Sequence, residues 1–310
     1  MVRRFEARPR HARRVLCVGS ITQDHVYRLE SRLIVGTKHR TTPKDDIGGG
    51  VAANAAVTIA RLGGLATLLG AIGADPVGDV VLEELRSERV EVQHVRRLAS
   101  HSTPTSVIIV EPGGERTIIA DSTIDLTRLP VPDLPAAHFD AVLVDARWSA
   151  ATRRALEMAQ RAGVPGVVDV DRLPAEPDLL DAASHLVFSE SALVEFAGSD
   201  DLEAGLRDVA GTSTARLSVT AGERGVFWLD NGSVRHLDAF EVDTVDTTGA
   251  GDVFHGAFAL ALAEGTEEAA AFRFASATAA LKCSRPGARA GIPNRADVER
   301  LLTVTQPTPT

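Results

Sequence analysis

The sequence Asp246-Thr247-Thr248-Gly249-Ala250-Gly251-Asp252 is followed at once by an apolar pattern of helical period. Small residues where a helix begins leave backbone N–H groups uncovered, and the helix dipole adds partial positive charge there. The segment therefore predicts a site for a phosphate group or a developing oxyanion. Asp252 would lie in the first helical turn, where its carboxylate can accept the proton of an attacking hydroxyl. The alternative is a glycine-rich loop in which the aspartate only caps the helix.

Around this segment, short apolar runs alternate with longer alanine-rich stretches of helical period. Such alternation is typical of βα units that build a mostly parallel sheet covered by helices. We expect strands over 15–19, 66–72, 141–144, 164–170, 185–188, 215–219 and 226–229. We expect helices over 51–62, 78–87, 149–162, 175–182, 199–210, 250–263 and 267–283, the last two ending the fold.

Two stretches interrupt the alternation. Residues 23–47 are polar and mixed, and residues 105–121 alternate around Pro112-Gly113-Gly114 like a β-hairpin. They predict either ordinary surface loops or a small β lid. With the lid, we expect a flexible basic arm over residues 1–14 and a flexible tail over 305–310. The α/β core then takes 15–22, 48–100 and 123–304, and the lid takes 23–47 and 101–122.

Composition limits the possible functions. The chain has 310 residues, of which 44% are hydrophobic and 24% charged, which suits one large α/β core. Its net charge of −9 argues against binding to nucleic acid or to an anionic membrane. No apolar run reaches the roughly 18 residues that span a bilayer. The two cysteines, Cys17 and Cys283, have no zinc-ligand spacing, so we expect a reduced, cytoplasmic protein.

A second glycine cluster, Gly48-Gly49-Gly50, precedes an alanine-rich helical segment that carries Asn54. It mimics a dinucleotide fingerprint, but the polar residues 41–46 before it do not form the buried strand that this motif requires. The cluster instead predicts a close approach of the backbone to a polyhydroxy ligand, with Asn54 projecting toward it. The phosphate-binding loop G-x-x-x-x-G-K-[ST] does not occur in the sequence.

Together the two glycine segments resemble the signatures of the ribokinase/PfkB family of carbohydrate kinases, over about residues 15–302. The resemblance implies an α/β three-layer sandwich with a mostly parallel central sheet and a small β lid. It also implies phosphate transfer from ATP, accompanied by Mg²⁺, to a sugar hydroxyl. By resemblance Asp252 is the catalytic base, Gly249, Ala250 and Gly251 form the anion hole, and the sugar hydroxyls are bound by Asp24, Gly49, Gly50 and Asn54.

The same resemblance assigns further residues. It implies that the nucleotide is bound by Ser189, Thr220, Gly222 and Gly225. Asp246 and Thr248 match positions that hold a monovalent cation such as K⁺ in many members, together with carbonyl groups of residues 283–291. Glu190 stands near the place of a metal-organising glutamate, in the stretch Ser189-Glu190-Ser191-Ala192. A homodimer that pairs through the lids is implied as well.

Within the family, Asp145-Ala146-Arg147-Trp148 and residues 280–293 resemble sulfofructose kinases. This resemblance implies phosphorylation of carbon 1 of 6-deoxy-6-sulfofructose, an anionic sugar, with Lys38 and Arg147 on the sulfonate, where arginine can offer two donors. Ala120, beside Asp121, replaces an asparagine of those enzymes. The alternatives are a kinase for a neutral or phosphorylated sugar or a nucleoside, and a non-catalytic sugar or nucleotide sensor.

Overall fold

The computed structural model describes residues 12–112, 115–130, 133–134, 137–174 and 176–304. Most of the predicted basic arm, the middle of the predicted hairpin turn and the whole predicted tail lie outside these residues. No helix in the described part of the chain is both long and apolar enough to cross a bilayer.

An eight-stranded sheet forms the centre of the molecule, in the order β14-β13-β12-β11-β10-β9-β1-β4. Six neighbouring strands are parallel, and two antiparallel strands close one edge. The parallel strands are β1 (Arg14–Val18), β4 (Leu65–Leu69), β9 (Ala141–Val144), β10 (Gly166–Val170), β11 (His185–Ser189) and β12 (Arg216–Thr220); the edge strands are β13 (Val226–Asp230) and β14 (Ser233–Leu237). The predicted mostly parallel sheet is confirmed.

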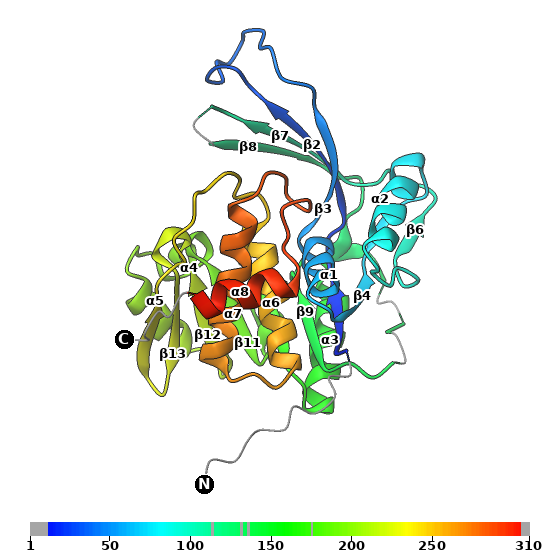
Figure 1. Ribbon diagram of the computed structural model, residues 1–310. Coiled ribbons are helices and arrows are strands. Elements are labelled where there is room, and N and C mark those ends of the chain that lie inside the picture. The colour runs from blue at the N-terminus through cyan, green and yellow to red at the C-terminus, as the bar shows by residue number, and fades with distance from the viewer. Residues whose placement is uncertain (1–11, 113–114, 131–132, 135–136, 175, 305–310) are drawn as a thin grey trace.

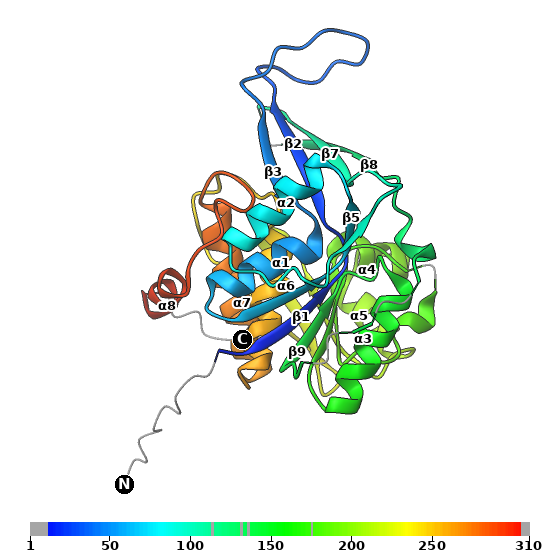
Figure 2. The same ribbon diagram turned by 90° about the vertical axis from the view of Figure 1, so that its right-hand side faces the viewer.

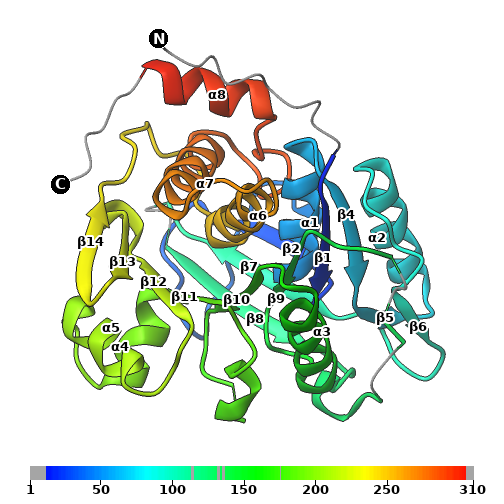
Figure 3. The ribbon, with the colours of Figure 1, turned by 90° about the horizontal axis from the view of Figure 1, so that it is seen from below.

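Helices cover both faces of this sheet (Figure 3). One face packs on α1 (Val51–Arg61), α6 (Ala250–Ala263) and α7 (Glu268–Cys283), and the other on α3 (Ser149–Ala162), α4 (Glu190–Ala197) and α5 (Leu202–Ala210). Strand β1 supplies both interfaces, since Val15 and Cys17 join one buried cluster while Leu16 and Val18 join the other. This alternation follows from the two-residue period of a strand buried on both faces.

A second sheet projects from the main body as the lid (Figures 1 and 2). Its order is β3-β2-β7-β8, with β2 and β7 parallel and the outer pairs antiparallel. The strands are β3 (Asp45–Gly49), β2 (Thr22–Arg28), β7 (Thr105–Val110) and β8 (Arg116–Asp121), so the predicted hairpin is confirmed. Along the sequence, β5 (Ala71–Gly73), α2 (Pro76–Ser87) and β6 (Arg96–Leu98) follow β4 of the central sheet and precede β7 of the lid.

Three local predictions were wrong. The helix expected over 175–182 is only the 3₁₀ turn Pro177–Leu180, and a second such turn is Leu126–Arg128. Strand β11 begins at His185, so few residues remain for a longer helix. The strand expected over 66–72 breaks at Gly70, where an added Cβ would lie 2.8 Å from the Gly19 carbonyl oxygen. A further helix, α8 (Arg295–Val304), follows the two that were expected to end the fold.

Candidate active site

A cavity of about 780 Å³ lies between the lid and the carboxyl ends of the central strands. Parallel α/β sheets bind ligands at this edge. Both predicted glycine segments reach it, because α1 and α6 both begin there. The predicted site residues that line it are Asp24, Gly50, Asn54, Arg147, Thr248, Gly249, Ala250, Gly251 and Asp252.

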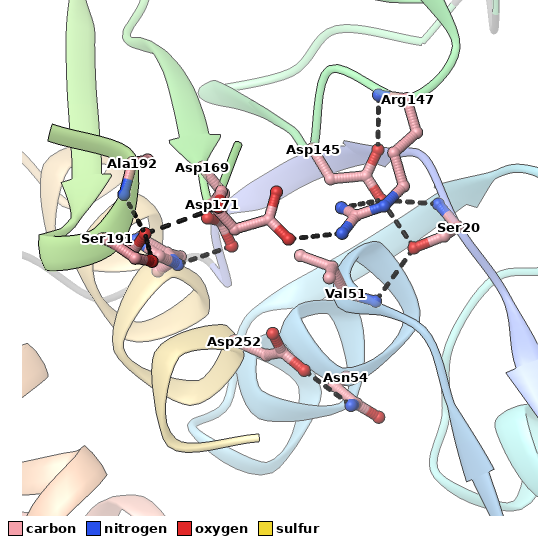
Figure 4. Close-up of polar contacts among 12 residues, drawn as sticks. Ser20, Val51, Asn54, Asp145, Arg147, Asp169, Asp171, Ser191, Ala192 and Asp252 are labelled. Carbon is pink, nitrogen blue, oxygen red and sulfur yellow. Dashed lines mark hydrogen bonds and ion pairs between the residues drawn. The ribbon is translucent and has the colours of Figure 1, made fainter. Parts of the chain in front are cut away.

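Asp252 lies in the first turn of α6, which Gly249 caps in the left-handed conformation (φ 73°). Its Oδ2 accepts a hydrogen bond of 2.7 Å from Nδ2 of Asn54 on α1 (Figure 4). Burial raises the pKa of Asp252 to about 7, and the nearby Asp169 carboxylate adds to the rise. A carboxylate with such a pKa is suited to accept a proton near neutral pH.

The start of α6 offers an anion site beside this carboxylate. The first N–H groups of a helix have no acceptor within the helix, and Gly249, Ala250 and Gly251 line the cavity. A Cβ added to Gly251 would meet no atom within 4 Å, so open space adjoins this residue. The predicted pairing of a base with an anion hole is thus geometrically possible.

Arg289, whose side chain had no predicted role, fixes the orientation of Asn54. This arginine is only 3% exposed. Its Nε donates to Oδ1 of Asn54 at 2.9 Å, and its Nη2 donates to the Gly49 carbonyl oxygen at 2.9 Å. Because Oδ1 of Asn54 accepts from Arg289, the Asn54 amide must present its NH₂ group to Asp252. The charge of Arg289 is balanced by Glu84, at 3.1 Å.

The predicted sugar-binding residues of the lid lie close together. Asp24 on β2 is buried at the cavity wall, where its Oδ1 accepts from the Thr22 hydroxyl at 2.9 Å, and burial raises its pKa. A Cβ at Gly49 would lie 2.1 Å from Oδ2 of Asp24, so only glycine fits beside this carboxylate. Gly49 itself does not line the cavity, whereas Gly50 does.

Arg147 follows β9 and lies between two carboxylates, Asp145 and Asp171 (Figure 4). Its Nη2 donates to Asp171, and its Nη1 lies 3.6 Å from Oδ2 of Asp145 without a hydrogen bond. Asp145 is buried and also accepts from the backbone N–H and hydroxyl of Ser20, both at 2.7 Å. Arg147 is therefore already paired with acidic groups where it borders the cavity.

A buried ion pair lies close to the candidate base. Nδ1 of His255 is 2.7 Å from Oδ2 of Asp169, and both side chains are less than 5% exposed. From its position in the sequence, His255 could either pack against the next helix or face the cleft. Its partner Asp169 was not anticipated, although its place near the carboxyl end of β10 was a usable signal.

Lys38 does not line the cavity. It is exposed in the polar segment between β2 and β3, which extends beyond the lid sheet (Figure 2). The structure therefore does not support the prediction that Lys38 binds the substrate in the cavity of its own chain. The segment that carries Lys38 turns away from the cavity (Figure 2). The cavity is lined by two arginines that no sequence pattern indicated, Arg116 and Arg172.

The four residues predicted to bind nucleotide lie along the same edge of the sheet, outside the cavity as described. Ser189 ends β11 and caps α4, accepting from Ala192 N at 3.2 Å. Thr220 ends β12, and Gly222 begins the 3₁₀ turn Gly222–Arg224 that Gly225 closes. Since β10, β11 and β12 are neighbours, these residues continue the line of the cavity beyond Asp171. Glu190 pairs with Arg224 at 2.7 Å.

The predicted monovalent-cation residues, Asp246 and Thr248, already have partners within the protein. Nζ of Lys282 donates to the Asp246 carbonyl oxygen at 2.6 Å and lies 3.5 Å from Oδ1 of Asp246. Burial lowers the pKa of Lys282, and the Asp246 carboxylate opposes this shift. Thr248 accepts from Nη1 of Arg116 at 3.1 Å. Among the described residues, no cluster of three or more His, Cys, Asp or Glu side chains is placed to hold a metal ion.

Comparison with known proteins places this geometry in a family. Residues 12–295 match the family described as pfkB family carbohydrate kinase. The chain belongs to this family. The chain is 29% identical to a ribokinase of Bacillus subtilis, covering 94% of this chain and 100% of that protein. It is 35% identical to a fructokinase of Klebsiella pneumoniae, covering 82% and 91%.

A solved structure from Agrobacterium tumefaciens, assigned as a ribokinase, superimposes with a TM-score of 0.87 at 34% identity, covering 95% of this chain and 98% of that one. The predicted ribokinase-like fold and the predicted carbohydrate kinase class are confirmed by these matches. Nothing in them concerns sulfofructose.

Proposed function

We propose that this carbohydrate kinase transfers the γ-phosphoryl group of ATP to a primary hydroxyl of a neutral sugar of the ribose or fructose class. The observation that carries the proposal is Asp252, a partly buried carboxylate with a pKa of about 7 that lines the cavity at the start of a helix. An aspartate that only caps a helix is typically solvated or ion-paired, whereas this carboxylate can take up a proton at neutral pH.

In the proposed reaction Asp252 accepts the proton of the sugar hydroxyl as its oxygen bonds to the γ-phosphorus. The bond between that phosphorus and the β,γ-bridging oxygen breaks, and ADP leaves without a phosphoenzyme. The N–H groups at Gly249 and Gly251 stabilise the charge on the transferred group, while Ala250 N donates to the Thr247 carbonyl oxygen within the turn. Asp24 and Asn54 hold the sugar, and closure of the lid excludes water.

For the nucleotide we propose the edge formed by Ser189, Thr220, Gly222 and Gly225. Mg²⁺ is usually bound by substrate phosphates and only one or two carboxylates, so it can enter with ATP. Asp171 fits this role, because it lines the cavity and its Oδ1 is buried without a hydrogen-bond partner. When bound, the ion would neutralise charge on the phosphates.

A neutral sugar is favoured by the charges around the cavity. Carboxylates outnumber guanidinium groups among the charged residues that line it, which are Asp24, Asp121, Asp125, Asp171, Asp252, Arg116, Arg147 and Arg172. Arg147 is already paired with acidic side chains. Carboxylates accept hydrogen bonds from sugar hydroxyls but repel a sulfonate.

The second candidate substrate is 6-deoxy-6-sulfofructose, phosphorylated on carbon 1. One observation favours it: Nη1 of Arg147 is buried and makes no hydrogen bond, so a ligand oxygen would satisfy it. Ala120, which replaces an asparagine of the sulfofructose kinases, lines the cavity together with Asp121. These two positions therefore bear directly on whether a sulfonate or a neutral sugar is bound. The homodimer, the cytoplasmic location and the ranges of the lid remain predictions.

The proposed function is tested by ADP release from Mg-ATP with ribose, fructose, 6-deoxy-6-sulfofructose, fructose 6-phosphate and adenosine. We expect the highest kcat/KM with ribose or fructose. A preference for the sulfonate that is lost in Arg147→Ala would favour the second candidate. Failure of every acceptor, with binding of sugar and ATP retained, would favour the sensor alternative.

A further inference from the structure

Lys282, near the end of α7, is the lysine that the structure buries completely, with 0% exposure. The chain has only two other lysines, Lys38 and Lys44, and both are exposed. Lysine is almost never fully buried unless its charge is paired. Its ammonium group is directed at Asp246, with the carbonyl oxygen at 2.6 Å and Oδ1 at 3.5 Å.

Asp246 begins the turn that leads into the anion hole. Its Oδ1 accepts from Thr248 N at 2.8 Å, and its Oδ2 accepts from Gly287 N at 3.0 Å. The turn continues directly into α6, where Ala250 N donates to the Thr247 carbonyl oxygen at 3.2 Å. A cation on Asp246 therefore acts on the segment that positions Gly249, Ala250 and Gly251.

Several carbonyl oxygens predicted to surround a K⁺ ion already accept hydrogen bonds within the protein. The Cys283 carbonyl accepts from Val245 N and Asp246 N, at 2.8 and 3.0 Å. The Gly287 carbonyl accepts from Gly291 N at 3.1 Å. The Arg289 carbonyl accepts from Nη1 of Arg61 at 2.6 Å.

We propose that the Lys282 ammonium group replaces the monovalent cation, so that this kinase needs no K⁺. An ammonium ion and K⁺ are similar in size and charge, and a tethered ammonium makes binding from solution unnecessary. Lys282 is then a positioning residue that holds the turn between Asp246 and the anion hole. This inference rests on the proposed phosphoryl transfer for its kinetic test but not for its binding test.

The kinetic test exchanges choline chloride for potassium chloride at constant ionic strength while ADP release is followed with the preferred sugar. The wild-type rate is expected to be the same in both salts. Lys282→Met keeps the buried volume but removes the charge, and we expect its turnover in choline to fall about 10- to 100-fold, the range for a lost hydrogen bond to a charged group. Potassium or ammonium chloride should restore part of that loss.

The matched control is Lys44→Met, which removes an exposed lysine paired with Asp46 and should respond to neither salt. The binding test needs no turnover: potassium should raise the thermal unfolding temperature of Lys282→Met relative to choline but leave the wild type unchanged. The comparison of unfolding temperatures tests the role of Lys282 even if no sugar is phosphorylated. A lack of sugar phosphorylation would count against the proposed function alone. Lys282→Arg provides a second variant that retains the charge if Lys282→Met does not fold.

Two results would overturn the inference. Activation of the wild type by potassium, with a matching rise in its unfolding temperature, would mean that the ion binds in addition to Lys282. A Lys282→Met variant with wild-type turnover and no response to potassium would mean that Lys282 only fills the core.

Discussion

Asp252 is placed where a carboxylate is costly to bury and chemically useful. Burial disfavours its charged form, and Asp169 adds repulsion, while the hydrogen bond from Asn54 favours the charged form. The balance leaves the pKa of Asp252 at about 7. At neutral pH the residue can therefore exist in both the proton-accepting and the protonated state.

The first prediction at this scale concerns pH. If Asp252 is the base, only its deprotonated form starts the reaction, so kcat/KM should fall as pH drops below about 7. The check is a pH profile of ADP release at low sugar concentration. An acid limb near pH 4, the value of an ordinary aspartate, would contradict the environment described for this residue.

The second prediction concerns stability. Because the pKa of Asp252 is raised in the folded state, the folded protein binds a proton that the unfolded chain has lost at pH 5. Its contribution is fully favourable below the unfolded pKa and is lost as pH rises through about 7. Asp252→Asn mimics the protonated form, so it should raise the unfolding temperature more at pH 8 than at pH 5. An equal effect at both pH values would contradict the raised pKa.

The sequence predicted Asp252, Asn54 and the glycines around them because each stands at the start of a helix, in a local pattern. It did not predict the roles of Arg289 and Lys282. Arg289 meets Asn54 across 235 residues of chain, and Lys282 meets Asp246 across 36. Long-range contacts of this kind leave no local pattern, since the residues next to an arginine in the sequence do not show whether its side chain is buried.

At the scale of elements, the site depends on the close packing of α1 and α6. Gly256 permits it, because a Cβ there would lie 2.6 Å from the Ala55 carbonyl oxygen. The approach of the two helices brings Asn54 within hydrogen-bond distance of Asp252. The loop after α7 completes the arrangement by extending Arg289 back to Asn54 and Gly49.

Arg289→Met is expected to lower kcat about 10²-fold, since misplacing a positioning group by about 1 Å can cost that much. Sugar KM should change less than kcat, because Asn54 remains present but is no longer held in one orientation. The measurement is steady-state kinetics together with the unfolding temperature.

The control for this variant is Arg285→Met in the same loop, which removes an arginine paired with Asp297, at 2.8 Å, away from the cavity. It should keep the wild-type kcat. If Arg289→Met also kept it, Asn54 would not need Arg289 for its orientation.

At the scale of the whole molecule, the central sheet positions the site residues and the second sheet covers them. The central sheet carries the helix starts and strand ends, and the lid covers them with β2, β7 and β8 (Figure 1). The sequence predicted the central sheet from hydrophobic periodicity, because βα alternation is local, whereas periodicity alone left the second sheet open between surface loops and a lid. It did not predict the strand order or the outward course of the segment that carries Lys38, because neither is encoded locally.

The lid and the core are joined at the cavity by Arg116 of β8, whose Nη1 donates to Thr248 at 3.1 Å. Arg116→Ala should lower kcat/KM for the sugar about 10-fold, the lower range for a hydrogen bond to a charged group, and raise ADP formation without sugar. The measurement is ADP release with and without acceptor.

The control in the same lid is Arg32→Ala, which removes an exposed arginine 3.3 Å from Glu115. It should leave both rates unchanged. An Arg116→Ala variant with the wild-type rates would mean that lid closure does not depend on this contact.

Sugar phosphorylation with Asp252 as the base is tested by a ³¹P NMR spectrum of Mg-ATP and the preferred sugar with wild type or Asp252→Asn. We expect a new sugar phosphomonoester in equal amount to ADP with the wild type, and turnover reduced by about 10²- to 10⁴-fold in the variant, which still binds both ligands. A variant that forms the phosphomonoester at the wild-type rate would contradict the assignment of Asp252 as the base. ADP without any phosphomonoester would contradict sugar phosphorylation itself.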